Sequence, residues 1–107
     1  MEAYPLSDSA ILLHAQDNVA TALRDLSPGD EVRVALGPLA HTVMLLEEIA
    51  FAHKFALRDI REGEEVLKYG MPIGRALRDI RAGEWVHVHN CRSHRWCYNN
   101  DKYGLQA

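Results

Sequence analysis

The chain has 107 residues, of which 48% are hydrophobic and 25% charged, a balance typical of one folded domain of ordinary size. Its formal net charge of −3 argues against a general nucleic-acid-binding protein, which usually carries a basic surplus. The N-terminus does not read as a signal peptide, no run reaches the roughly 20 apolar residues that span a bilayer, and two cysteines make no disulfide framework; we therefore expect a cytoplasmic protein without membrane contact.

Short apolar or alternating runs bounded by glycine or proline predict a chain made mostly of β-strands. In chain order the predicted strands are Ala10–His14, Glu31–Leu36, His41–Leu46, Glu65–Tyr69, Ile73–Leu77 and Trp85–His89. One helix is predicted at Asn18–Leu23, because Asp17 can act as its N-cap and its apolar residues fall on one stripe. We therefore expect an all-β domain over residues 1–90, with one or two short helices, and a polar C-terminal tail over residues 91–107.

One ten-residue sequence motif occurs three times and predicts the corners of the fold. Each copy has an apolar anchor, a turn whose glycine can take a positive φ, and the start of a strand. The copies are Leu23–Val32, Leu57–Val66 and Leu77–Val86. Because their spacing is unequal, we expect a compact β fold with similar corners rather than a solenoid, which needs a constant period.

The predicted strand Trp85–His89 carries two histidines that could form a site. Residues two apart share a strand face, so His87 and His89 would stand side by side and could bind a metal ion or an anion. Asn90 follows at the strand end. The alternative is a solvated polar face without a ligand.

A second candidate lies at the predicted start of the helix. His14 and Asn18 flank this point, where free backbone amides favour an anion. Simple capping by Asp17 is the alternative.

Two further candidates contain lysines. In the segment Ala52–Ala56, His53 and Lys54 would point to opposite sides if the chain is extended, so only one of them would face a ligand. Lys68 opens Lys68–Gly74, where two glycines around a proline could bring the backbone close to a ligand. An exposed loop and an ordinary hairpin are the respective alternatives.

A possible metal motif follows the last predicted strand. Cys91, His94 and Cys97 have C-x2-H-x2-C spacing. Three ligands this close in sequence, with no second cluster, make a weak zinc signature, and we expect no disulfide between the two cysteines.

Taken together, the four candidate sites resemble one known family. The segments His14–Ala20, Ala52–Ala56, Lys68–Gly74 and His87–Asn90 occur in the order and approximate spacing of the SAF domain of the altronate/galactarate dehydratase family. Similar domains form the small subunit of sulfolactate sulfo-lyase. The resemblance covers about Ala10 to Asn90, and it departs from the family at Ala52, where a glycine is usual.

The resemblance implies a compact β-clip fold and a part in removing water from sugar acids. In that family the domain sits beside a much larger catalytic domain, and iron is implicated in several members. We therefore expect a small subunit or N-terminal domain of a hydro-lyase that is inactive without a large dehydratase chain or domain, and that could form a homo-oligomer. Alternatives are a sulfo-lyase small subunit and a stand-alone module that binds a sugar acid.

The implied chemistry removes the proton α to a carboxylate and expels the β-hydroxyl. The carboxylate needs cationic or N–H partners, and the developing enediolate needs a metal or a donor. The residues expected to contact the anionic sugar acid are His14, Asn18, His53, Lys54, Lys68 and Asn90. The residues expected to bind a divalent metal such as iron are His87 and His89. The four histidines of these sets would converge on one concave surface, and the catalytic base stays unassigned.

Overall fold

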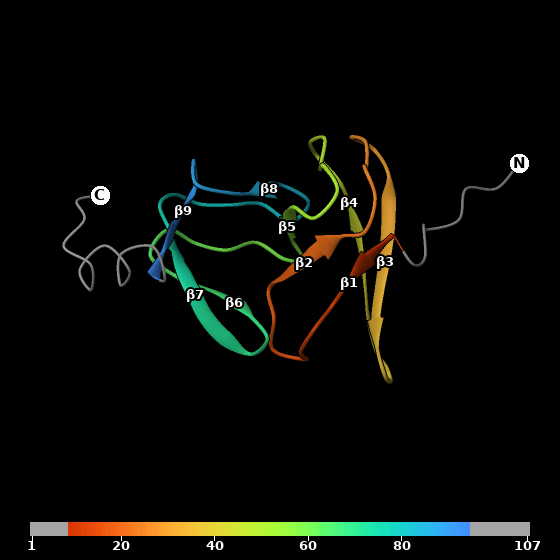
Figure 1. Cartoon of the computed structure of the whole chain (residues 1–107). Helices are drawn as coiled ribbons and strands as arrows, with labels where there is room; N and C mark the ends of the chain where they lie inside the picture. Colours follow the sequence, from red (N-terminus) through yellow and green to blue (C-terminus); the bar gives the residue numbers. More distant parts are fainter. Residues whose placement is uncertain (1–8, 95–107) are drawn as a thin grey trace, which may run out of the picture.

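In the computed structural model residues 9–94 are described, and they form nine short strands (Figure 1). The strands are β1 (Ala10–Ile11), β2 (Val19–Ala22), β3 (Glu31–Leu36), β4 (Leu39–Met44), β5 (Lys54–Ala56), β6 (Glu65–Lys68), β7 (Met71–Ala76), β8 (Trp85–Val86) and β9 (Cys91–Ser93). The predicted all-β fold class is confirmed. No helix within the described range is long and apolar enough to cross a membrane.

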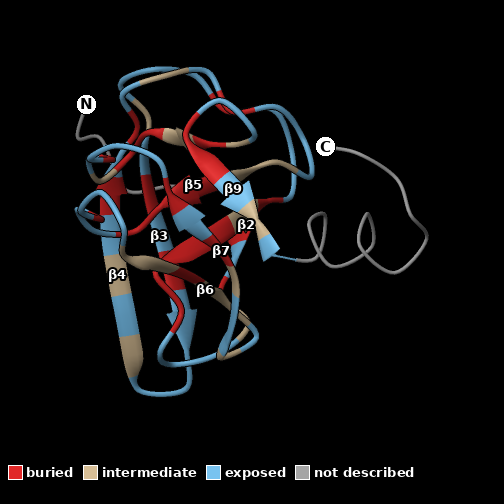
Figure 2. Cartoon of the chain, turned by 90° about the vertical axis from the view of Figure 1, so that its left-hand side faces the viewer, coloured by how far each residue is buried: buried red, intermediate tan, exposed pale blue. Residues whose placement is uncertain are grey.

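Three antiparallel sheets make up the domain. The largest has the strand order β1-β2-β5-β8, and it lies between the β3–β4 hairpin and the sheet β6-β7-β9 (Figure 1). Consecutive residues of β5 face opposite sides of this middle sheet, so Phe55 joins one hydrophobic cluster and Ala56 joins the other. Buried residues gather where β2 and β5 pass through the middle of the domain, and most of the loops are exposed (Figure 2).

The helix predicted at Asn18–Leu23 is wrong, because Val19–Ala22 forms β2. This strand pairs with β1 on one side and with β5 on the other. Three of its four residues are buried, so the strand shows no alternation of apolar and polar side chains. Over so few residues, a strand buried on both faces cannot be told from the apolar stripe of a short helix.

The strand predicted at Trp85–His89 is shorter than expected. It ends at Val86, and the chain turns through His87–Asn90, with the Asn90 and Cys91 amides both donating to the His87 carbonyl. The chain then enters β9, which pairs with β7. His87 and His89 therefore do not share a strand face, because the strand ends before both of them. The sheet also includes three residues beyond the domain boundary expected at residue 90.

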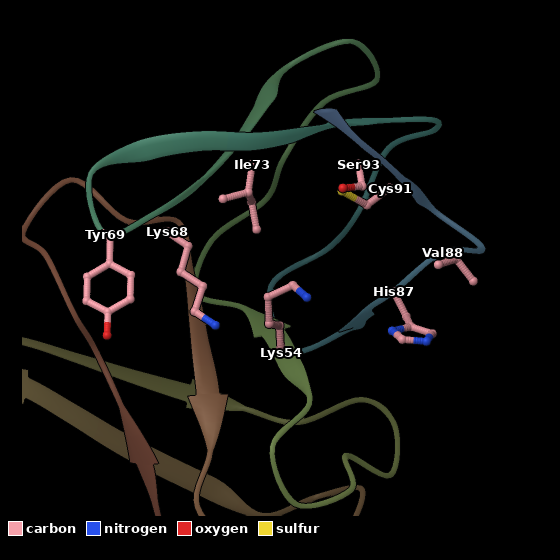
Figure 3. Close-up of a pocket in the computed structure, with 8 residues that line it drawn as sticks. All are labelled: Lys54, Lys68, Tyr69, Ile73, His87, Val88, Cys91 and Ser93. Carbon is pink, nitrogen blue, oxygen red and sulfur yellow. The ribbon is translucent and has the colours of Figure 1, made fainter. Parts of the chain in front are cut away.

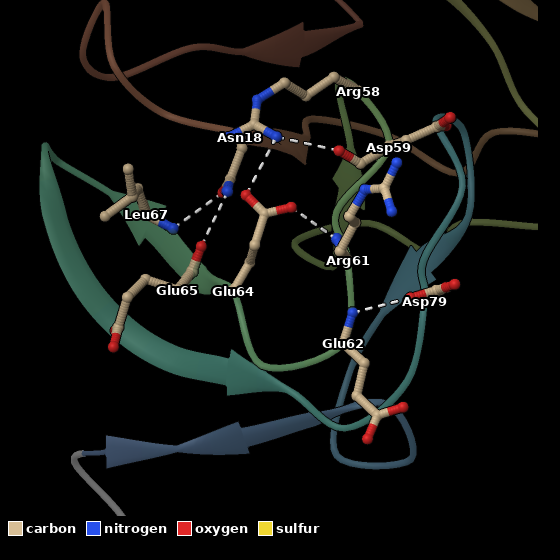
Figure 4. Close-up of polar contacts among 9 residues, drawn as sticks. All are labelled: Asn18, Arg58, Asp59, Arg61, Glu62, Glu64, Glu65, Leu67 and Asp79. Carbon is tan, nitrogen blue, oxygen red and sulfur yellow. Dashed lines mark hydrogen bonds and ion pairs between the residues drawn. The ribbon is translucent and has the colours of Figure 1, made fainter.

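The three repeated motifs form corners of the same construction. The turn glycines Gly29, Gly63 and Gly83 have φ values of 89°, 86° and 89°, in the left-handed region that favours glycine. The carboxylate after each glycine accepts a hydrogen bond from the backbone amide three residues earlier. These pairs are Asp30 with Ser27 (2.9 Å), Glu64 with Arg61 (2.7 Å) and Glu84 with Arg81 (2.8 Å). Figure 4 shows the middle corner.

A fourth corner of the same kind is present at Ile49–His53, and the sequence pattern missed it. Ile49 exchanges two backbone hydrogen bonds with Leu26, as the anchors of the second and third copies do with each other. Ala52 donates to Ala22 and His53 accepts from Ala22, which repeats the bonds that the other corners make to a neighbouring strand. Ala52 takes the glycine position with φ 73°, and His53 takes the carboxylate position.

Candidate functional site

A cavity of about 410 Å³ opens between β5, the β6–β7 hairpin and the segment from β8 to β9 (Figure 3). Its size is within the range that holds small-molecule ligands. The residues that line it are Lys54, Lys68, Tyr69, Ile73, His87, Val88, Cys91 and Ser93. The lining includes two lysines and a histidine, and no carboxylate is among the lining residues.

The two lysines extend toward the same space from different strands (Figure 3). Lys54 begins β5 and Lys68 ends β6, and within residues 9–94 neither forms an ion pair. Burial lowers the pKa of Lys54, and the positive charge of Lys68 lowers it further. A bound anion would relieve this repulsion, because it favours the charged form of both amines.

His87 stands at the wall of this cavity as a weak base. Burial lowers its pKa below the ordinary value of 6.5, and the positive charges of His53, Lys54 and His89 add to the effect. At neutral pH the ring is therefore uncharged and can accept a hydrogen bond or a proton.

Three of the four predicted histidines gather around one tryptophan. The rings of His87 and Trp85 are stacked, with centroids 5.0 Å apart and planes at 10°. The rings of His89 and His53 lie 4.9 Å and 5.6 Å from Trp85, and His53 lies 5.1 Å from His87. Trp85 Nε1–H donates to His53 Nδ1 at 3.0 Å, so a neutral His53 carries its proton on Nε2.

His14 does not join this group, and it contacts the tip of the β6–β7 hairpin instead. A Cβ atom placed on Gly70 would lie 3.0 Å from the His14 ring, so only glycine fits there without displacement. Asp17 is buried, and its carboxylate accepts from the amides of Tyr69 at 3.0 Å and Gly70 at 2.7 Å. These contacts hold the turn, in which Tyr69 and Gly70 both have positive φ.

Asn18 and Asn90, both predicted to contact substrate, are fully buried and bind backbone. The Asn18 side chain accepts from the Leu67 amide and donates to the Glu65 carbonyl, beside the irregularity in β6 (Figure 4). The Asn90 side chain accepts from the His87 amide and donates to the Trp85 carbonyl. Neither lines the cavity; Asn18 fixes the strand that carries Lys68, and Asn90 fixes the turn that carries His87.

Metal binding by His87 and His89 stays a prediction, because the described residues add no third ligand beside them. Within residues 9–94 no group of three histidine, cysteine, aspartate or glutamate side chains could hold a metal ion. His94 lies 2.8 Å from a Glu65 carboxylate oxygen, and Cys91 is a free buried thiol whose pKa is raised by burial. Cys97 lies outside the described residues, as does the polar tail after it.

Several residues of the cavity wall did not emerge as candidates from the sequence. Tyr69 and Ile73 lie inside the Lys68–Gly74 segment, so that motif contained the signal, although only its lysine was chosen. Ser93 emerges only through the pairing of β9 with β7, which no local pattern predicts. The same pairing brings Cys91 to the cavity wall, whereas the sequence offered this cysteine only as part of a possible metal motif.

Comparison with known proteins places the chain among dehydratase sequences. The family described as the altronate/galactarate dehydratase SAF domain matches residues 8–94. The chain is 54% identical over 83 residues to altronate dehydratase of Escherichia coli, and 42% identical over 85 residues to altronate dehydratase of Bacillus subtilis. These matches cover 78% and 79% of this chain, and the chain spans only 16% of either dehydratase.

A shorter relative is similar over part of the chain. Subunit alpha of (2R)-sulfolactate sulfo-lyase from Chromohalobacter salexigens is 50% identical over 50 residues. That match covers 47% of this chain and 53% of the subunit.

Proposed function

Because the chain belongs to the altronate/galactarate dehydratase SAF-domain family, we propose that it contributes an anion-binding pocket to the dehydration of a sugar acid. The domain works with a dehydratase catalytic region, carried on the same chain or on another. Support for this division comes from the relatives, in which the matched part is 16% of a much longer dehydratase.

The observation that carries this proposal is that Lys54 and Lys68 line the cavity and no carboxylate in the lining neutralises them. Lys54 and Lys68 hold the substrate carboxylate, since an ammonium group makes its strongest hydrogen bonds with an anion. Both cations also stabilise the negative charge that builds up on that carboxylate when the α-proton is removed. His87, uncharged at neutral pH, accepts a hydrogen bond from a substrate hydroxyl.

No step of this chemistry is assigned to a metal on the described residues. His87 and His89 supply two imidazoles, and within residues 9–94 they have no third ligand. Iron, which family resemblance suggests, would need ligands from outside this range, and its binding by His87 and His89 stays a prediction.

The test is calorimetric titration of the full chain with altronate and with galactarate. Replacing Lys54 or Lys68 by Met is expected to weaken binding at least about tenfold, because a hydrogen bond to a charged group contributes about 1.5–3 kcal/mol. The matched control is Arg33→Met, which removes an exposed cation on β3 and should leave binding unchanged. Equal affinity of all four proteins, or no binding by the wild type, would refute the proposal.

A second candidate is a sulfo-lyase subunit, favoured by the match to subunit alpha. Sulfolactate carries a carboxylate and a sulfonate, so each lysine could pair with one acidic group. Titration with sulfolactate separates the two functions: tighter binding of sulfolactate than of altronate selects the sulfo-lyase.

A further inference from the structure

The fourth corner lacks the stabilising residues that the other three share. In each of those corners a glycine occupies the left-handed position and a carboxylate caps a backbone amide. At the fourth corner Ala52 holds φ 73°, a conformation that is strained for a residue with a Cβ, and His53 replaces the carboxylate. Departures of this kind from a local rule are expected where a residue serves function.

His53 makes a contact that no carboxylate of the other corners makes. Its Nδ1 atom accepts from the indole N–H of Trp85 at 3.0 Å. The indole nitrogen can only donate a hydrogen bond, so the side chain of residue 53 must present an unprotonated acceptor atom at the position of Nδ1. The contact joins the residue before β5 to β8, next to the point where Phe55 pairs with Trp85.

The indole in turn supports the cavity wall. The ring of His87 lies flat against Trp85, at 10° and 5.0 Å, and His87 lines the cavity beside Lys54. An indole that lost its anchor could rotate away, and His87 would lose the surface against which it is stacked.

We propose that His53 is a positioning residue: it holds the Trp85 indole, and the indole holds His87 in place at the anion pocket. The role of this pocket in binding a sugar acid is taken from the proposed function. His53 itself does not touch the ligand.

Two substitutions at one position test the proposal in the full chain. His53→Asn keeps an acceptor, its Oδ1, near the place of Nδ1, whereas His53→Phe keeps a ring and removes the acceptor. Altronate affinity, measured by calorimetry, is expected to stay within about threefold in His53→Asn and to fall at least about tenfold in His53→Phe. The opposite order would assign His53 to ring packing, and an equal large loss in both would assign it to direct ligand contact; either result overturns the proposal.

A ligand-independent readout keeps the proposal separate from the proposed function. In NMR spectra the Trp85 indole N–H should exchange slowly with solvent in the wild type and in His53→Asn, and quickly in His53→Phe. Nuclear Overhauser contacts between the ring protons of Trp85 and His87 should persist in His53→Asn and be lost in His53→Phe. A Trp96→Phe background leaves Trp85 as the one indole of the chain. If the wild type binds no sugar acid, the proposed function fails, while unchanged spectra in His53→Phe would overturn the positioning role by themselves.

Discussion

Ala52 adopts a backbone conformation that suits glycine, and this defines a test of the corner geometry. Its φ of 73° places it where the three matched corners have glycine. Ala52→Gly removes the steric cost of about 1–2 kcal/mol, and the added freedom of the unfolded chain returns about 0.4–1 kcal/mol of it. The variant should therefore raise the free energy of unfolding by up to about 1.5 kcal/mol, measured by urea denaturation. Ala50→Gly, in the same corner but outside the left-handed region, is the control and should lower it; a loss in both variants would contradict the assignment.

The lowered pKa of His87 makes the stability of the domain depend on pH. The folded-state pKa lies below the ordinary 6.5, so as the pH falls the unfolded chain takes up this proton first. The folded state therefore loses stability from about pH 6.5 downward, through the folded pKa. His87→Phe keeps a ring against Trp85 without a titrating nitrogen, and its free energy of unfolding should decline less than that of the wild type between about pH 7 and about pH 5.5. The same decline in both proteins would count against this.

At the scale of elements, the β6–β7 hairpin depends on Asp17, a residue about fifty positions earlier. Both amides of the hairpin turn donate to this buried carboxylate, and the hairpin carries Lys68 and Tyr69 into the cavity wall. Asp17→Asn replaces one acceptor by an amide nitrogen, which leaves a backbone N–H without a partner at a cost of about 1–3 kcal/mol. We expect this loss of stability in urea, faster hydrogen exchange at Tyr69 and weaker altronate binding.

A matched control exists at another corner. Asp25 accepts one hydrogen bond from the Phe51 amide at an exposed position. Asp25→Asn should cost less stability and leave altronate binding unchanged. Equal losses of affinity in the two variants would mean that Asp17 acts on the fold as a whole and not on the hairpin.

The same scale shows what sequence reasoning could reach. Glu31–Leu36 was predicted with its correct bounds, because Val32 and Val34 alternate with exposed residues on a sheet with one buried face. β2 was mistaken for a helix because it is buried on both faces, so its side chains do not alternate between apolar and polar. The local sequence pattern also contains no information about its pairing with β5. The turn after Val86 depends on a buried Asn90 that binds the backbone on both sides, a contact that exists only in the folded chain.

The candidate site was predictable to a similar degree. Lys54, Lys68 and His87, all singled out in the sequence, line the cavity, since charged and titratable residues in short motifs stand out in a sequence. The contact between Trp85 and His53, and the fourth corner that sets it up, were not found, because Ala52 and His53 break the repeated motif at its two diagnostic positions. Asn18 was assigned to substrate because it flanks the predicted helix start, where free amides would favour an anion, whereas its partners are backbone atoms of β6.

At the scale of the whole molecule, the proposed function divides the active site between this domain and a catalytic region. The cavity presents cations and a neutral imidazole, and sequence-related dehydratases extend far beyond the matched region. Under the proposed function, this cavity wall recognises the carboxylate and one hydroxyl of the sugar acid, and the catalytic region recognises the remaining hydroxyls.

The placement of β5 between two hydrophobic clusters has a consequence for how the domain unfolds. Phe55 packs into one cluster and Ala56 into the other, and β2 divides its residues in the same way, with Ala20 and Val19. Neither half can lose its packing without freeing a strand that the other half needs, so the two clusters should melt as one cooperative unit. In urea, the fluorescence of Trp85 in a Trp96→Phe background and the far-ultraviolet circular dichroism should trace a single coincident transition. Separate midpoints would show that each cluster unfolds by itself. A single midpoint would mean that a destabilising mutation in either cluster also destabilises the pocket, because Lys54 lies on the strand that both clusters share.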